Sequence, residues 1–224
     1  MREFWGKVFA ILWKDLLLEI RTKEIVVSLL VFALLTIIIF SFAFEPGPGR
    51  IGIVAPGVLW VAFTFAGVLG LNRSFIREKD SGCLQGLMLC PVDRDVVYFG
   101  KMLASFIFMF AMELIIMPVF SIFLNLPIFM PGLILIAFIA TIGFVAVGTI
   151  FSAIAVNTKA REFMLPLLFF PVVIPVLIAA VKSTALVLDD SPWALLWPWL
   201  EMIAAFDAIF LVVSSLIFQY ALEE

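Results

Sequence analysis

The chain contains no histidine and only two cysteines among its 224 residues. Without histidine, neither a Ser-His-Asp triad nor an HExxH zinc site can form. The glycines make no GxxxxGK[ST] phosphate-binding loop, so we do not expect the chain to hydrolyse ATP itself. The two cysteines, Cys83 and Cys90, are spaced unlike any zinc or redox motif. The sequence therefore predicts a protein that is not an enzyme and that holds no metal ion.

Charged residues are also scarce, at 14% of the chain against 65% hydrophobic residues. A soluble domain has about 25% charged residues. The net charge is −3, and the cations are too dispersed for the basic patch that nucleic-acid binding requires. The composition therefore excludes nucleic acid as a partner and favours membrane lipid as the surroundings of the chain.

Long apolar stretches define the expected fold. A helix needs about 20 apolar residues to cross a bilayer. Six stretches meet this requirement: residues 25–44, 51–71, 102–124, 132–156, 163–181 and 200–220. We therefore predict an all-α polytopic membrane protein, with a single transmembrane domain over residues 1–224 and six membrane-spanning helices.

The distribution of Lys and Arg predicts the orientation of these helices. Twelve cations lie in the N-terminal segment and in the connectors after the second and fourth spans, whereas the opposite side has only Arg50 and Lys182. Cytoplasmic loops carry the excess of Lys and Arg. We therefore expect both termini in the cytoplasm and the protein in the cell inner membrane. Charges throughout the first 21 residues argue against a cleaved signal peptide.

Residues 1–24 form a separate element before the first span. Trp5, Val8, Phe9, Leu12 and Leu16 recur at helical spacing, with cations on another face. This pattern predicts an amphipathic helix in the cytoplasmic membrane interface. The alternative is a soluble helix packed on a partner.

Residues 72–101 form the one sizeable soluble segment. It contains a short amphipathic run from Cys83 to Cys90, followed by Pro91. A segment of 30 residues cannot build its own hydrophobic core. We therefore expect it to dock on the rest of this protein or on another one.

Two carboxylates lie within predicted spans: Glu113 in the third and Asp207 in the sixth. A charge in the bilayer normally faces a bundle interior, a cavity or a partner because exposure to lipid costs about 2.5–3.5 kcal/mol. Either residue could mark a substrate path or coupling site, or could fix helix packing through internal hydrogen bonds. Pro171 and Pro175 predict a kinked or broken fifth span, which could line a path or simply fit its neighbours.

Tryptophans are concentrated before the sixth span, where Trp193, Trp197 and Trp199 lie within seven residues. Such a cluster is typical of the aromatic belt at the lipid headgroups. A contact with a periplasmic partner is the alternative.

Several segments resemble the CcmB family, the haem-exporter permease subunits of bacterial cytochrome c maturation. They are IVAPGVLWVA (53–62), LNRSFIREKDSGCLQGLMLCPV (71–92), Lys101 and LPLLFFPVVIPVLIAA (165–180). The segment after the second span is also similar to that of ABC-2 exporter permeases. Length, number of spans and topology agree with the CcmB family, so the resemblance covers nearly the whole chain.

The resemblance implies a non-catalytic transmembrane subunit of an ABC-type complex. Its expected partners are an ATPase (CcmA-like), a haem-handling membrane subunit (CcmC-like), a small single-span subunit (CcmD-like) and a periplasmic haem chaperone (CcmE-like). ATP hydrolysis would release the haem-loaded chaperone. No cofactor is expected on this chain, because ATP and haem would bind to partner subunits.

The segment Glu78–Pro91 is our candidate for the element that couples the permease to the ATPase. Its apolar residues would enter a groove of the ATPase, as an amphipathic helix does. The charged rim of this contact would consist of Arg77, Lys79, Asp80 and Arg94. The predicted coupling residues are Glu78, Asp80, Gly82, Leu84, Leu87, Met88, Leu89 and Pro91.

Two other functions remain open from the sequence. One is an ABC-2 exporter permease for a lipid, drug or glycan. The other is an ATP-independent scaffold or ion-coupled carrier, in which Glu113 and Asp207 would relay protons.

Overall fold

The computed structural model describes residues 2–43, 51–90, 92–124, 126, 130–158 and 160–221. Over these residues the chain forms eight helices and no strands. The helices are α1 (Arg2–Thr22), α2 (Glu24–Ala43), α3 (Ile51–Asp80), α4 (Cys83–Leu89), α5 (Arg94–Leu124), α6 (Pro131–Ala155), α7 (Arg161–Leu188) and α8 (Trp193–Ala221).

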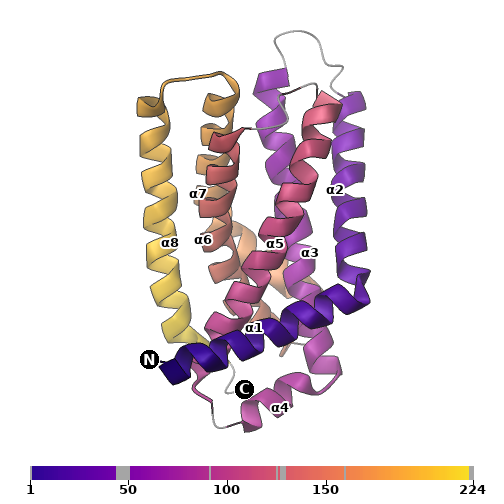
Figure 1. Cartoon of the computed structure of the whole chain (residues 1–224), viewed down its shortest axis with the longest axis vertical. Coiled ribbons are helices and arrows are strands. Elements are labelled where there is room, and N and C mark those ends of the chain that lie inside the picture. The colour runs from indigo at the N-terminus through magenta and orange to yellow at the C-terminus, as the bar shows by residue number, and fades with distance from the viewer. Residues whose placement is uncertain are drawn as a thin grey trace.

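Six of these helices, α2, α3 and α5 to α8, are long and apolar enough to cross a membrane. They run along the long axis of the molecule as a bundle (Figure 1). The prediction of an all-α polytopic membrane protein is thus confirmed. Helix α1 crosses the lower end of the bundle, where α4 and both chain ends also lie. We call this the basic end, because most of the Lys and Arg residues gather there.

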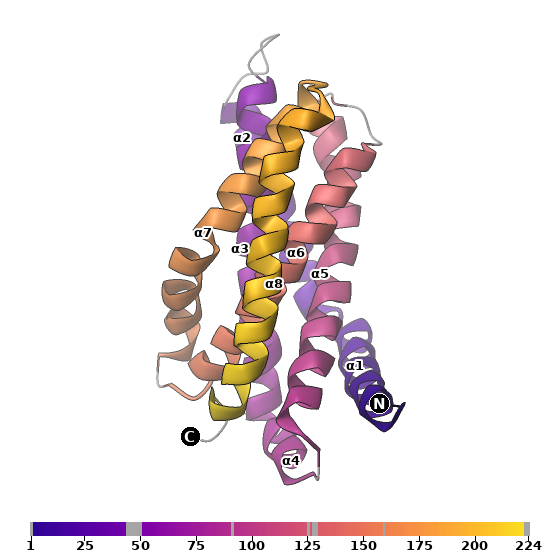
Figure 2. The ribbon, with the colours of Figure 1, turned by 90° about the vertical axis from the view of Figure 1, so that its left-hand side faces the viewer.

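Helix α6 is the centre of the bundle and contacts α3, α5, α7 and α8 (Figure 2). Its buried face is rich in small residues, which let neighbouring helices approach closely. These buried small residues are Ala137, Ala140, Gly143, Ala146, Gly148, Ser152, Ala153 and Ala155. Every other helix that packs on α6 is therefore positioned relative to this one rigid element.

Several helices are longer than the membrane spans predicted from hydropathy. Helix α3 continues to Asp80 and α5 begins at Arg94, so the predicted soluble segment consists mainly of helix extensions and only α4 stands apart. Helix α7 is continuous through its three prolines, so it is not broken. Its lower half leans away from α8 (Figure 2), and it packs on α3 as well as on α8.

Helix α1 has two apolar faces rather than the single face that the spacing suggested. Val8 and Ile11 are buried on the α5 side, and Ile11 lies directly against Gly100 of α5. Phe9 and Trp13 belong to the other face and are exposed. One face therefore attaches α1 to the bundle, which leaves the second face free for the membrane interface predicted above.

Candidate functional site

The last turn of α3 carries Glu78, whose carboxylate lies in a cluster of charges built from three helices. The Lys14 ammonium of α1 donates to Glu78 Oε1 at 2.7 Å, and the Lys101 ammonium of α5 donates to Oε2. Asp15 lies 2.9 Å from the Lys14 ammonium and 3.6 Å from that of Lys101. The Lys101 ammonium also lies 4.8 Å from the centre of the Phe75 ring, a cation–π contact. We call Lys14, Asp15, Glu78 and Lys101 the ionic cluster.

Burial affects the two α1 members of the ionic cluster differently. Burial lowers the pKa of Lys14, but the carboxylates of Asp15 and Glu78 outweigh it, so that this pKa lies above the ordinary lysine value. Burial raises the pKa of Asp15, although Lys101 favours its charged form. Lys14 therefore stays charged, whereas Asp15 is neutralised more easily than an ordinary aspartate as the pH falls.

The two residues after Glu78 attach α3 to the other side of the bundle. The Lys79 ammonium donates to the carbonyl oxygen of Val156 at 2.8 Å and to Asn157 Oδ1 at 2.9 Å, at the C-terminus of α6. Arg161 begins α7 and donates to both carboxylate oxygens of Asp80, at 2.7 and 3.3 Å. Together with the ionic cluster, these contacts fix the end of α3 to α1, α5, α6 and α7.

Helix α4 follows this anchored end through a tight turn at Gly82. The φ of Gly82 is +72°, a left-handed conformation that glycine adopts readily. Leu89 is 87% exposed, whereas Leu87 is half-buried and packs against the hydrophobic core. Gly86 is exposed, and a Cβ there would meet no atom within 4 Å. The free face of α4 therefore includes Leu89 and Gly86, and Leu87 faces the chain itself.

The structure thus separates the predicted coupling residues into two groups. The carboxylates of Glu78 and Asp80 are engaged within the chain, and Leu89 projects outward. The side chains of Leu84 and Met88, and Pro91 as a whole, lie outside the described residues. The contact with an ATPase stays a prediction.

Inside the bundle, Glu113 of α5 is 2% exposed and faces α6. Its two carboxyl oxygens lie 3.0 and 2.8 Å from Thr141 Oγ1. The same hydroxyl lies 2.7 Å from the carbonyl oxygen of Ala137. Thr141 is the residue that the sequence interpretation missed here, and a threonine within an apolar span was the available signal.

Asp207 of α8 lies against the opposite side of α6. It is 6% exposed, and its Oδ1 is so close to Gly143 that a Cβ at that position would overlap with it. Thr141 and Gly143 are two residues apart, so they point to nearly opposite faces of α6 at almost the same height. The two intramembrane carboxyls are therefore held on either side of the central helix and are not in contact with each other.

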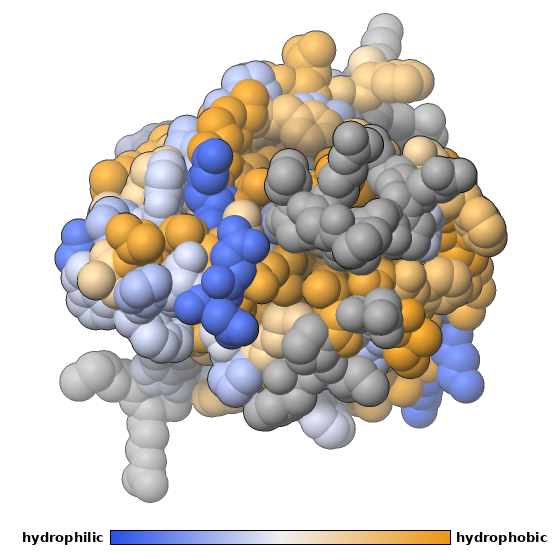
Figure 3. Space-filling model, turned by 90° about the horizontal axis from the view of Figure 1, so that it is seen from above, coloured by the Kyte–Doolittle hydropathy of each residue, from blue (hydrophilic) through white to orange (hydrophobic). Residues whose placement is uncertain are grey.

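The remaining predicted site residues lie on the surface of the bundle. Pro171 and Pro175 are exposed along α7, so they do not line its interior. Trp193 and Trp197 are 59% and 61% exposed and lie one turn apart on α8. Trp199 is half-buried against the core. Seen from the end of the bundle where α8 begins, strongly hydrophilic side chains form a patch near the centre, and hydrophobic ones cover much of the described surface around it (Figure 3).

Comparison with known proteins identifies a family that matches nearly the whole chain. The family model described as "CcmB protein" matches residues 6–224. "Heme exporter protein B" of Pseudomonas aeruginosa is 29% identical over 171 residues, which cover 75% of this chain and 77% of that protein. The protein of the same name from Rhodobacter capsulatus is 30% identical over 172 residues, covering 75% and 78%. That of Escherichia coli K12 is 31% identical over 96 residues, covering 41% and 44%.

Proposed function

The chain belongs to the CcmB protein family, and we propose that it is the transmembrane permease subunit of an ABC-type haem-exporter complex in c-type cytochrome maturation. The similar proteins from Pseudomonas aeruginosa and Rhodobacter capsulatus are called heme exporter protein B, and the alignment covers three quarters of the chain. The six apolar helices supply the membrane domain that such a subunit needs.

The observation that carries the proposal is the construction of the basic end. Helix α4 presents Leu89 outward, and the three residues Glu78, Lys79 and Asp80 connect α3 to four other helices. A force applied to α4 is therefore transmitted to α3 and from there to the bundle. A partner ATPase docked on α4 is thereby linked to the bundle, and the sequence has no phosphate-binding loop of its own.

We place the basic end and both termini in the cytoplasm of the inner membrane, because the Lys and Arg residues gather there. The ATPase (CcmA-like) then docks on α4, and ATP binds to that subunit. Haem is handled by a CcmC-like subunit, with a CcmD-like single-span subunit in the same complex. ATP hydrolysis serves to release a haem-loaded CcmE-like chaperone. The exposed Trp193 and Trp197 lie on the periplasmic side, in the aromatic belt at the lipid headgroups.

Leu89→Asp is the variant that tests the docking of the ATPase. The side chain is 87% exposed, so an aspartate there leaves the permease folded but places a charge in the apolar groove of the partner. We expect copurification of the ATPase with the tagged permease to fall at least about tenfold, which corresponds to about 1.4 kcal/mol. Leu87→Asp is a poorer test because that side chain packs on the permease core.

Leu89→Met is the matched control, because it keeps an apolar side chain of similar volume at the same position. We expect it to retain the ATPase, and we expect both variants to reach the membrane in the same amount as the unmodified protein. Full recovery of the ATPase with Leu89→Asp would contradict docking through α4.

A further inference from the structure

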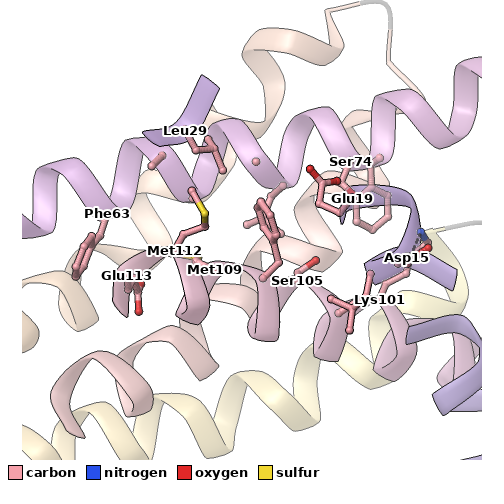
Figure 4. Close-up of a pocket in the computed structure, with 18 of the residues that line it drawn as sticks. Asp15, Glu19, Leu29, Phe63, Ser74, Lys101, Ser105, Met109, Met112 and Glu113 are labelled. Atoms are coloured by element: carbon pink, nitrogen blue, oxygen red, sulfur yellow. Dashed lines mark ion pairs between the residues drawn. The ribbon is translucent and has the colours of Figure 1, made fainter. Parts of the chain in front are cut away.

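A cavity of about 50 Å³ runs between α3 and α5, and residues of α1 and α2 also line it (Figure 4). Asp15, Glu19 and Lys101 line its end at the basic side, and Glu113 lies at the other end. Lys101 and Glu113 are 12 residues apart on α5, or about 18 Å along the helix axis. The cavity therefore extends from the ionic cluster towards a carboxyl deep in the membrane.

Polar groups line the part of the cavity nearer the basic end. Ser74 of α3 and Ser105 of α5 line it near the ionic cluster, and Met109 lies between them and Glu113 (Figure 4). A buried water needs roughly 10–15 Å³ of free space and two to four polar partners. Near the ionic cluster both requirements are met, so water fits in that part of the cavity. Met109 is a flexible side chain that can move aside to extend the path.

No cation among the described residues pairs with Glu113. The charged groups that face the cavity are Asp15 and Glu19 of α1 and Lys101 of α5, all at the opposite end. Helix α3 contributes Ser74, α2 contributes Leu29, and α6 contributes the Thr141 hydroxyl. An ionised carboxylate buried without a partner cation is strongly disfavoured.

The hydrogen-bond geometry around Thr141 shows how the site accommodates a neutral carboxyl. A threonine hydroxyl has one hydrogen to donate and two lone pairs to accept. When it donates to the carbonyl oxygen of Ala137 at 2.7 Å, its contact with Glu113 at 2.8 Å requires the hydrogen of a protonated carboxyl. When Glu113 is ionised, the hydroxyl must turn and donate to it. The Thr141 hydroxyl therefore has one hydrogen-bond arrangement for the neutral Glu113 carboxyl and another for the ionised one.

We propose that Glu113 is a proton-binding site inside the membrane, loaded from the basic end through the cavity between α3 and α5. A hydronium ion in the cavity gives its proton to a carboxylate oxygen of Glu113, an O–H bond forms and a water molecule remains. The carboxyl becomes neutral, and Thr141 turns to accept from it and to donate to Ala137. The ligand of this site is a proton, and its binding requires neither ATP nor haem.

Cysteine accessibility in sealed membrane vesicles tests the path. In full-length protein with Cys83→Ser and Cys90→Ser, Ser74→Cys and Ser105→Cys are each treated with a membrane-impermeant trimethylammonium-ethyl methanethiosulfonate. Leu114→Cys is the matched control, since Leu114 lies on the exposed face of α5. We expect both cavity cysteines to react at least about tenfold faster than the control, because the thiolate is the reactive form and does not form in lipid.

The two native cysteines identify the side of the membrane on which the basic end lies. Cys83 and Cys90 are exposed at the basic end, so their reaction in otherwise unmodified protein marks that side of the membrane. We expect the cavity cysteines to react from this same side. Reaction only from the other side, or at the rate of the Leu114→Cys control, would overturn the proposed path. Reaction of Cys83 and Cys90 from the periplasmic side would contradict the proposed orientation of the chain. The cavity proposal would still hold if the cavity cysteines react from the same side as these two.

Dicyclohexylcarbodiimide tests the proton itself, because it modifies protonated carboxyls in apolar surroundings. In the full chain in lipid nanodiscs, mass spectrometry should find the adduct on Glu113, decreasing as the pH is raised. Glu113→Gln should abolish the adduct and leave the fold intact, since an amide also donates to Thr141. Absence of the adduct at every pH at which the protein remains folded would refute the proposal.

Discussion

Removal of the Glu78 charge tests how strongly the ionic cluster holds α3. Glu78→Gln keeps the size of the side chain but leaves Lys101, which is 2% exposed, with Asp15 at 3.6 Å as its remaining carboxylate. Removing one partner of a buried ion pair costs about 3–5 kcal/mol. Because Asp15 remains and the Lys14 side chain is partly exposed, we expect the lower value, about 3 kcal/mol.

A double-mutant cycle of Glu78→Gln with Lys101→Met measures the coupling energy between these two residues apart from their other contacts. Lys101→Met alone leaves the Glu78 carboxylate with Lys14 only. The double variant Glu78→Gln/Lys101→Met removes both charges and leaves Lys14 paired with Asp15. The double variant should therefore lose less than the sum of the single losses, with a coupling energy of about 2 kcal/mol.

Thermal unfolding of the full chain in nanodiscs is the assay for this cycle. A loss of about 3 kcal/mol lowers the Tm by about 6–12 °C in a chain of this size. Glu3→Gln is the control, because its pair with Lys7 is exposed at 3.7 Å and is worth about 0–1 kcal/mol. Single variants of the cluster that unfold like the control, or strictly additive losses, would refute the reasoning.

Three further predictions follow from single contacts and are measured by the same unfolding assay. Gly143→Ala places a Cβ against the Asp207 carboxyl and should cost about 1–3 kcal/mol through overpacking; an unchanged Tm would contradict the close contact. Trp60→Phe removes the indole N–H that donates to Thr184 at 2.9 Å and should cost about 1 kcal/mol. Asp80→Asn should cost at most about 1 kcal/mol because its ion pair is exposed, and this difference should vanish at high salt.

The six membrane spans could be predicted from the sequence because lipid demands long apolar helices whatever their packing. The helix ends could not be predicted in the same way. Hydropathy identifies only the apolar part of a helix, whereas α3 continues to Asp80 and α5 already begins at Arg94. Glu78 and Lys101 form an ion pair between these two polar extensions. The partners that stabilise these extensions come from α1, α6 and α7, which are distant in the sequence.

The charged residues after the second span illustrate the same limit. The sequence places Glu78, Lys79 and Asp80 in a polar segment and predicts Lys79 and Asp80 at the rim of a docking surface. In the structure, all three contact other helices of the chain. A list of charges along one segment does not show which way each side chain points, since this depends on α1, α6 and α7. For Glu113, the sequence indicated a buried carboxyl, but Thr141 and the cavity emerged only from the fold.

Affinity purification of the tagged chain from native membranes in mild detergent tests the central claim most directly. The copurified proteins are identified by mass spectrometry, and the sample is examined for the absorption of haem. The account predicts an ABC ATPase together with a haem-binding membrane partner. Recovery of the intact permease without any ATPase would contradict it.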